Sequence, residues 1–242
     1  MNARHQKYRL NVDLRQVKDA TSAFLHSLLL HRSVGKFTYK EENNYTLGSL
    51  GVGEVDCQTI DLTYVRINSE ELCAYIDEQV RAFYSDVEES FTSHPPTPAS
   101  SPSSPPSRFR EFSPSFNASI GVEFLQKKKR QWPLSEESVS WEVWNLGLDI
   151  VKASNDELSV MRESVAEALG EIVLTICSQI NRQQYMPKMP TRSELNSVFD
   201  SRFTDCQPYL YKIMQSTPNT RIQSQRPLVA FQNVLKNLAY PS

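Results

Sequence analysis

The stretch WNLGLDI, residues 144–150, decides the fold class because its apolar side chains recur at every second position. That period is typical of a β-strand with one buried face. The same alternation appears earlier in the chain, at Ile120, Val122 and Phe124. The two runs predict adjacent strands that are joined by a loop of about 15 residues, a length at which loops are often functional or disordered.

Amphipathic helices are predicted around these strands, because apolar residues recur there at steps of three and four. The first helix spans residues 14–30 and is expected to end at Gly35. The second follows Ser69 and buries a face made of Leu72, Ile76, Val80, Phe83 and Val87. The third and longest begins at the capping-box pair Ser154 and Glu157. Its apolar face consists of Met161, Val165, Leu169, Ile172, Val173, Ile176 and Ile180. This order of elements indicates an α+β fold, with a mostly antiparallel central sheet backed by helices.

Shorter elements complete the predicted fold. Residues 36–47 are aromatic and β-branched and should form a hairpin that turns at Asn43-Asn44. Residues 55–67 alternate again and predict one long strand. Thr191 is placed to begin a short helix.

The domain is predicted to span residues 1–214, with an insertion at residues 92–119. The insertion contains seven of the chain's fourteen prolines and nine serines. Such a composition cannot bury enough apolar surface to offset the entropy of ordering, so we expect this insertion to be disordered. Tyr209, Tyr211 and Ile213 predict the last strand of the domain. Residues 215–242 follow as a polar linker and a candidate amphipathic helix that carries Leu228, Phe231, Leu235 and Leu238.

Composition narrows the class of protein. The net charge of the chain is -2, which gives no general attraction to nucleic acid or to an anionic membrane. No apolar run approaches the roughly 18 residues that span a bilayer, and no secretory signal is present at the start. The four cysteines are scattered and form no C-x-x-C motif, as expected of free thiols in a reducing compartment. We therefore expect a soluble cytoplasmic protein with no nucleic-acid partner and no direct membrane insertion.

Catalytic motifs are absent from the sequence. His26 and His31 are five residues apart, which places them on different faces of a helix and argues against a shared metal. A nucleophile pair of Cys57 with a histidine gains no support from spacing. The sequence therefore predicts a protein that is not an enzyme and holds no cofactor or metal.

The stretch KKKRQWPLSEES, residues 127–138, lies within the predicted inter-strand loop. Its basic residues form a weak footprint for an anionic ligand, and a solvated loop accounts for them equally well. The apolar tripeptide Trp132-Pro133-Leu134 allows two interpretations. The tryptophan is either a core residue near a strand end, or part of an exposed apolar tip held out by the proline.

Several longer strings occur in the order typical of one family. They are LLLHRSVGKF (28–37), VDCQTIDLTYVR (55–66), SEEL (69–72), QKKK (126–129), Trp132-Pro133, WEVW (141–144), PKMPT (187–191), VFD (198–200) and QPYLYKI (207–213). On these residues the chain resembles the autophagy-related protein 101 family, HORMA-domain subunits of the autophagy-initiation kinase complex.

The resemblance implies a HORMA domain without catalytic activity, which pairs with and stabilises the HORMA domain of autophagy-related protein 13. It also implies membership of a complex with the autophagy-initiating Ser/Thr kinase, and recruitment from the cytoplasm to the preautophagosomal structure. Downstream autophagy factors would be recruited by an exposed finger that maps onto Trp132, Pro133 and Leu134. Leu134 stands where the family typically has phenylalanine, so the tip stays apolar but loses one ring.

The partner HORMA interface is expected at Leu30, His31 and Arg32, where a matching string meets the end of the first predicted helix. The alternative for His31 and Arg32 is that they only cap and solvate the helix C-terminus, where cations are favoured. An alternative function is a HORMA-type adaptor in another pathway, such as checkpoint signalling or chromosome-axis assembly.

Overall fold

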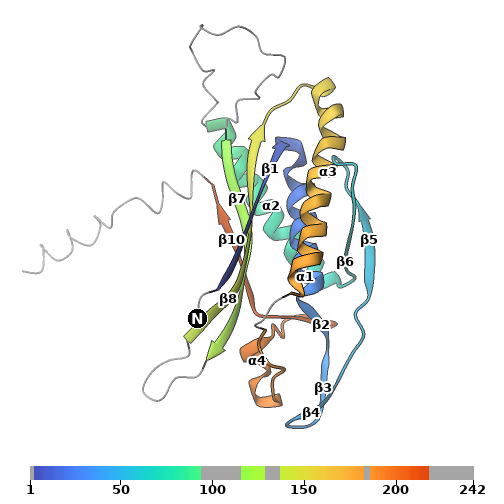
Figure 1. Ribbon diagram of the computed structural model, residues 1–242, viewed down its shortest axis with the longest axis vertical. Coiled ribbons are helices and arrows are strands. Elements are labelled where there is room, and N and C mark those ends of the chain that lie inside the picture. The colour runs from blue at the N-terminus through green and yellow to red at the C-terminus, as the bar shows by residue number, and fades with distance from the viewer. Residues whose placement is uncertain (1–2, 94–115, 129–136, 183–185, 218–242) are drawn as a thin grey trace, which may run out of the picture.

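The computed structural model describes residues 3–93, 116–128, 137–182 and 186–217, and its centre is a four-stranded sheet (Figure 1). The strands lie in the order β1 (Arg4–Asp13), β8 (Glu137–Val151), β7 (Phe116–Lys128) and β10 (Tyr211–Ser216). β1 runs parallel to β8, whereas β8 with β7 and β7 with β10 are antiparallel pairs. The prediction of an α+β fold with a mostly antiparallel central sheet is therefore confirmed.

Three long helices gather on one side of this sheet, namely α1 (Val17–His31), α2 (Glu70–Ser93) and α3 (Asn155–Ile180) (Figure 1). The core lies between the helices and the sheet. Phe24 and Leu28 of α1 and Trp144 and Ile150 of β8 are all fully buried there. Burial of a large apolar side chain is worth about 1.5–3 kcal/mol, so this layer is the main source of stability. The predicted face of α2 is buried at every position, as the helical period required.

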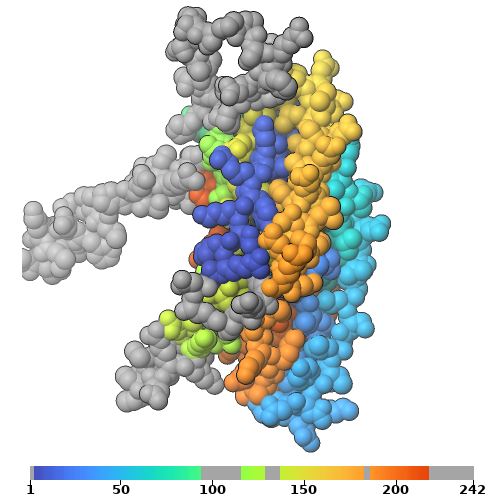
Figure 2. Space-filling view, in the orientation of Figure 1, coloured from blue at the N-terminus to red at the C-terminus, as the bar shows by residue number. Residues whose placement is uncertain are grey.

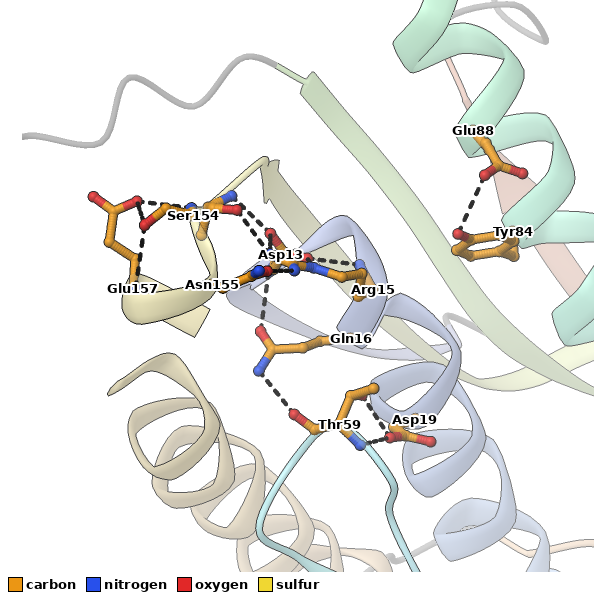
Figure 3. Close-up of polar contacts among 11 residues, drawn as sticks. Asp13, Arg15, Gln16, Asp19, Thr59, Tyr84, Glu88, Ser154, Asn155 and Glu157 are labelled. Carbon is orange, nitrogen blue, oxygen red and sulfur yellow. Dashed lines mark hydrogen bonds and ion pairs between the residues drawn. The ribbon is translucent and has the colours of Figure 1, made fainter. Parts of the chain in front are cut away.

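Asp13 joins the end of β1 to the first helical turn (Figure 3). Its carboxylate caps the short 3-10 helix η1 (Leu14–Gln16) and accepts hydrogen bonds from Arg15 and from the Ala153 N–H, the latter at 2.7 Å. Burial alone would raise the pKa of Asp13, but these hydrogen bonds outweigh burial and lower the pKa below its usual value. One buried carboxylate thereby holds the start of α1 against the end of β8.

The predicted capping box of α3 is also present. The Ser154 side chain accepts a hydrogen bond from the Glu157 N–H, and the Glu157 carboxylate accepts one from the Ser154 N–H (Figure 3). Two N–H groups that would lack partners at the helix end are satisfied in this way.

Three pairs of short strands lie outside the central sheet. They are β2 (Ser33–Gly35) with β9 (Cys206–Pro208), β3 (Phe37–Glu41) with β4 (Asn44–Leu47), and β5 (Val52–Asp56) with β6 (Thr63–Ile67). The hairpin predicted at residues 36–47 is confirmed, but it turns at Glu42-Asn43 and not at Asn43-Asn44, because Asn44 is paired with Glu41. The single long strand predicted at residues 55–67 is wrong, because the chain turns back between β5 and β6. The turn is held by Thr59, whose N–H and hydroxyl both donate to the Asp19 carboxylate of α1 at 2.6 Å (Figure 3).

Gly35 does not end the first helix. α1 ends at His31 with Arg32 as its C-cap, and Gly35 is paired in β2. A Cβ atom on Gly35 would lie 1.9 Å from the Gly48 carbonyl oxygen, so glycine is required for close approach of two backbones. The first helix also begins later than expected, at Val17, because residues 14–16 form η1.

Residues at both ends of the predicted insertion belong to regular secondary structure. Thr92 and Ser93 complete α2, and β7 begins at Phe116, whose ring lies 6.1 Å from that of Phe91. The remainder of the predicted insertion, residues 94–115, lies outside the described residues, as do residues 218–242 of the predicted linker and terminal helix. Thr191 begins a short helical segment as predicted, made of η2 (Arg192–Glu194) and α4 (Leu195–Val198).

Candidate protein-interaction sites

Arg32, one of the three residues predicted to form the partner interface, is buried. Its side chain is 1% exposed and forms a two-pronged contact with Glu142 of β8, with Nε 2.7 Å and Nη2 3.2 Å from the two carboxylate oxygens. Nη2 also donates to the Ile180 carbonyl at the end of α3, at 2.7 Å. The Arg32 carbonyl in turn accepts from the Tyr209 N–H at 2.9 Å. Arg32 therefore connects four segments, and its side chain is not available to a partner.

Leu30 and His31 are the last two residues of α1. Leu30 is half-buried and packs on the core. The His31 ring is half-buried, with Nε2 3.3 Å from the sulfur of Cys177 on α3. Burial, and then the neighbouring Arg32 cation, lower the pKa of His31 below its usual value. The structure thus brings His31 and Cys177 into contact, with the imidazole held towards its neutral form.

The sequence did not reveal two exposed residues beside His31. Cys177 is exposed, and Leu174, one turn earlier on α3, is 70% exposed. Residues three apart on a helix share one face, and Cys177 contacts His31, so we group these two side chains with His31 and its neighbour Leu30 as one candidate surface. We call Leu30, His31, Leu174 and Cys177 the α1–α3 surface, and α3 runs along the outside of the molecule (Figure 2). The break in the apolar period at Leu174, which lies off the predicted face of α3, was the available signal.

The predicted finger, Trp132-Pro133-Leu134, lies outside the described residues. The structure describes the two strands on either side of it. β7 continues to Lys128 and β8 begins at Glu137, and these two residues are paired across the strands. The connection is therefore residues 129–136, shorter than the loop predicted, and it starts and ends at a paired strand end.

Other candidate groups do not assemble a catalytic or metal site. Burial raises the pKa of the Cys57 thiol to about 12, so little thiolate would form at neutral pH. His26 is 2% exposed, and its ring is stacked against Tyr64. Across residues 3–93, 116–128, 137–182 and 186–217, no three His, Cys, Asp or Glu side chains are grouped so as to hold a metal ion. In the same part of the chain, no helix has both the length and the apolarity to cross a membrane.

Comparisons with known proteins agree on one family. A profile of the family described as "Autophagy-related protein 101" matches residues 9–193. Proteins called autophagy-related protein 101 from Xenopus tropicalis, Xenopus laevis and Homo sapiens are each 40% identical to the chain over 214 residues, which cover 88% of the chain and 88% of each relative.

Proposed function

Because the chain belongs to the autophagy-related protein 101 family, which gives it a role in autophagy, we propose that it is a noncatalytic adaptor of the autophagy-initiation kinase complex. It pairs with and stabilises the HORMA domain of autophagy-related protein 13, and so joins the complex of the initiating Ser/Thr kinase. It acts in the cytoplasm and is recruited to the preautophagosomal structure. Downstream autophagy factors bind the finger Trp132-Pro133-Leu134.

The observation that carries the pairing is the exposure of Leu174. Leu174 is 70% exposed, so most of its side chain is not buried in the fold, and it lies one turn before Cys177, which contacts His31. Exposed apolar side chains grouped with polar ones are typical of protein-binding surfaces. The α1–α3 surface is thus the region of the described chain where we place the partner HORMA domain.

The backbone below this surface is held rigidly. The ends of α1 and α3 are joined through Arg32, which contacts Glu142 and the Ile180 carbonyl. A surface whose elements are already fixed loses little conformational entropy on binding. Arg32 therefore positions the proposed interface without touching the partner. This role would explain why the family string at residues 28–37 includes a buried arginine.

Co-purification from cells tests the adaptor role. A tagged chain should recover the HORMA partner together with the initiating kinase. Recovery of chromatin proteins in their place, or turnover of a substrate that depends on Cys57 or His31, would overturn the proposal.

The finger is tested separately. Trp132→Ala should lower recruitment of downstream factors while the free energy of unfolding changes by no more than about 0.5 kcal/mol, as expected of an exposed side chain. Trp141→Ala is the contrasting control, because Trp141 is 4% exposed and its truncation should cost about 3–5 kcal/mol. A comparable loss of stability in Trp132→Ala would show that Trp132 is a core residue.

Leu134→Phe tests the chemistry of the tip. A second ring should strengthen recruitment, because aromatic side chains add contact area at binding sites. Weaker recruitment by Leu134→Phe would mean that the partner's pocket is shaped for leucine.

A further inference from the structure

A cleft of about 790 Å³ lies between the end of β7 and the segment that contains Met186–Pro190, η2 and α4. In Figure 2 this segment (orange) lies next to the strand ends (yellow-green) at the lower end of the molecule. The residues of the cleft that matter here are Lys127, Lys128, Lys188, Met186, Met189 and Glu194. None of them belongs to the α1–α3 surface or to the finger.

The residues that line the cleft carry three positive charges and one negative charge, that of Glu194, so the net charge is positive. Lys127 and Lys128 line it on one side and Lys188 on the other, and all three are exposed. The carboxylate of Glu194 is engaged with its own helix start, where it accepts from the Thr191 hydroxyl at 3.1 Å. Three cations around one concave site attract an anionic ligand over a distance of about 10 Å at moderate salt.

One wall of the cleft carries two exposed methionines. Met186 is 41% exposed and Met189 is 45% exposed, although large apolar side chains normally avoid water. Methionine is flexible and polarisable, and it is common at surfaces that bind varied apolar side chains. The cleft therefore combines apolar contact with positive charge.

The wall that carries the methionines is held in place. Pro187 and Pro190 are buried, and the Pro190 carbonyl accepts a hydrogen bond from the Tyr39 hydroxyl at 2.9 Å. Two residues further on, the Arg192 N–H donates to the Glu42 carbonyl at 2.9 Å. Fixing this backbone leaves only side chains to be ordered on this side of the cleft when a ligand binds, which lowers the entropic cost of binding.

The chain's own C-terminal residues are poorly suited to occupy the cleft. Residues 218–242 contain Arg221, Arg226 and Lys236 and no aspartate or glutamate. Their charge has the same sign as that of the cleft, so bringing them together is unfavourable. Charge complementarity therefore favours a separate partner over these C-terminal residues.

From these observations we infer that the cleft binds a segment of a partner protein in which acidic residues flank large apolar side chains. The apolar side chains contact Met186 and Met189, and the acidic groups lie against Lys127, Lys128 and Lys188. The inference does not depend on pairing with another HORMA domain, nor on the finger.

Selection of displayed random peptides on the immobilised full chain tests this inference. Enriched peptides should carry aspartate or glutamate next to leucine, phenylalanine or methionine. They should be lost when selection is repeated on Lys127→Glu/Lys188→Glu and kept on Lys7→Glu/Lys152→Glu, which changes the net charge equally at exposed sites outside the cleft. The inference would be overturned if no peptide were enriched. It would also be overturned if the same peptides were enriched equally on Lys127→Glu/Lys188→Glu and on Lys7→Glu/Lys152→Glu.

The most enriched peptide is then labelled and its affinity measured by fluorescence anisotropy. Lys127→Glu/Lys188→Glu should weaken binding at least about tenfold, and higher salt should weaken binding to the unaltered chain. Met186→Ser/Met189→Ser should also weaken it at least about tenfold, unlike the control Val52→Ser/Val65→Ser at other exposed apolar positions. Unchanged affinity in either cleft variant would contradict the inference. Competition between the peptide and a second copy of the chain would instead show that the cleft binds the chain itself.

Discussion

Removing one partner of the Arg32–Glu142 pair should destabilise the fold far more than removing both. Both side chains are at most 1% exposed, and they are joined at 2.7 Å and 3.2 Å. Arg32→Met removes the cation that lies 2.7 Å from the buried Glu142 carboxylate, and the Ile180 carbonyl loses its 2.7 Å donor. Arg32→Met/Glu142→Met removes both charges and fills the space with apolar atoms of similar length.

The expected loss in the free energy of unfolding follows from the burial of the Arg32 and Glu142 side chains. Breaking a fully buried ion pair by removal of one partner costs about 3–5 kcal/mol, whereas replacing both partners by apolar residues is often close to neutral. We therefore expect Arg32→Met to lose about 4 kcal/mol. For a domain of this size each kcal/mol shifts Tm by about 2–4 °C, so Tm should fall by about 8–16 °C. The double variant should regain most of this loss, although the Ile180 carbonyl remains without its donor at a cost of about 1–3 kcal/mol.

Urea denaturation of the wild type, the two single variants and the double variant gives the coupling energy directly. The expected result is a coupling of at least about 2 kcal/mol between Arg32 and Glu142. Losses below about 1 kcal/mol in the single variants, or a double variant whose loss equals the sum of the two, would refute the role assigned to this pair.

Two further predictions concern stability. Burial, and then the charge of Arg66, lower the pKa of His26 from 6.5 to about 4, so the folded state binds a proton less readily than the unfolded state. Stability should therefore be lost as pH falls from about 6.5 towards about 4, by about 2 kcal/mol between about pH 7.5 and about pH 5, and His26→Leu should flatten this dependence in urea titrations. Gly35→Ala should cost about 1–3 kcal/mol, because its Cβ would meet the Gly48 carbonyl oxygen at 1.9 Å. Gly53→Ala is the matched control, since a Cβ there has no atom within 4 Å, and equal thermal shifts in the two variants would contradict the packing argument.

Periodicity identified the helices because their buried faces lie against one continuous core. It failed for β1, where the buried residues are Leu10, Val12 and Asp13, at the end of the strand. The first half of this edge strand is polar and resembles an unstructured N-terminal segment in sequence. Its strand partner is β8, which is far away in the sequence. An edge strand with one exposed face carries little apolar signal.

The turn between β5 and β6 was missed for a different reason. Residues 57–62 contain no glycine, proline or asparagine, and Asp61 is the one residue among them of a type that is common in turns. The turn is fixed by distant partners, with Thr59 bonded to Asp19 and Asp61 paired with Arg162 at 2.7 Å. Tertiary contacts of this kind cannot be seen from local sequence.

The same limit applies to the candidate interface. Leu30, His31 and Arg32 are consecutive, yet the structure places the first two at the surface and buries the third. An arginine is buried only when a partner balances its charge, and Glu142 is 110 residues away along the chain. Leu174 and Cys177 join the same surface from α3, and only the packed fold brings the two helix ends together.

The affinity of the chain for the HORMA domain of autophagy-related protein 13 tests the central claim most directly. Leu174→Asp places a charge in the α1–α3 surface, and Val160→Asp, about 21 Å away along α3, is a matched control because Val160 is 74% exposed and Leu174 is 70% exposed. Calorimetry should show Kd raised at least about thirtyfold by Leu174→Asp and unchanged by Val160→Asp, with both variants as stable as the wild type. Equal affinities for the wild type and Leu174→Asp would contradict the pairing surface proposed for this protein.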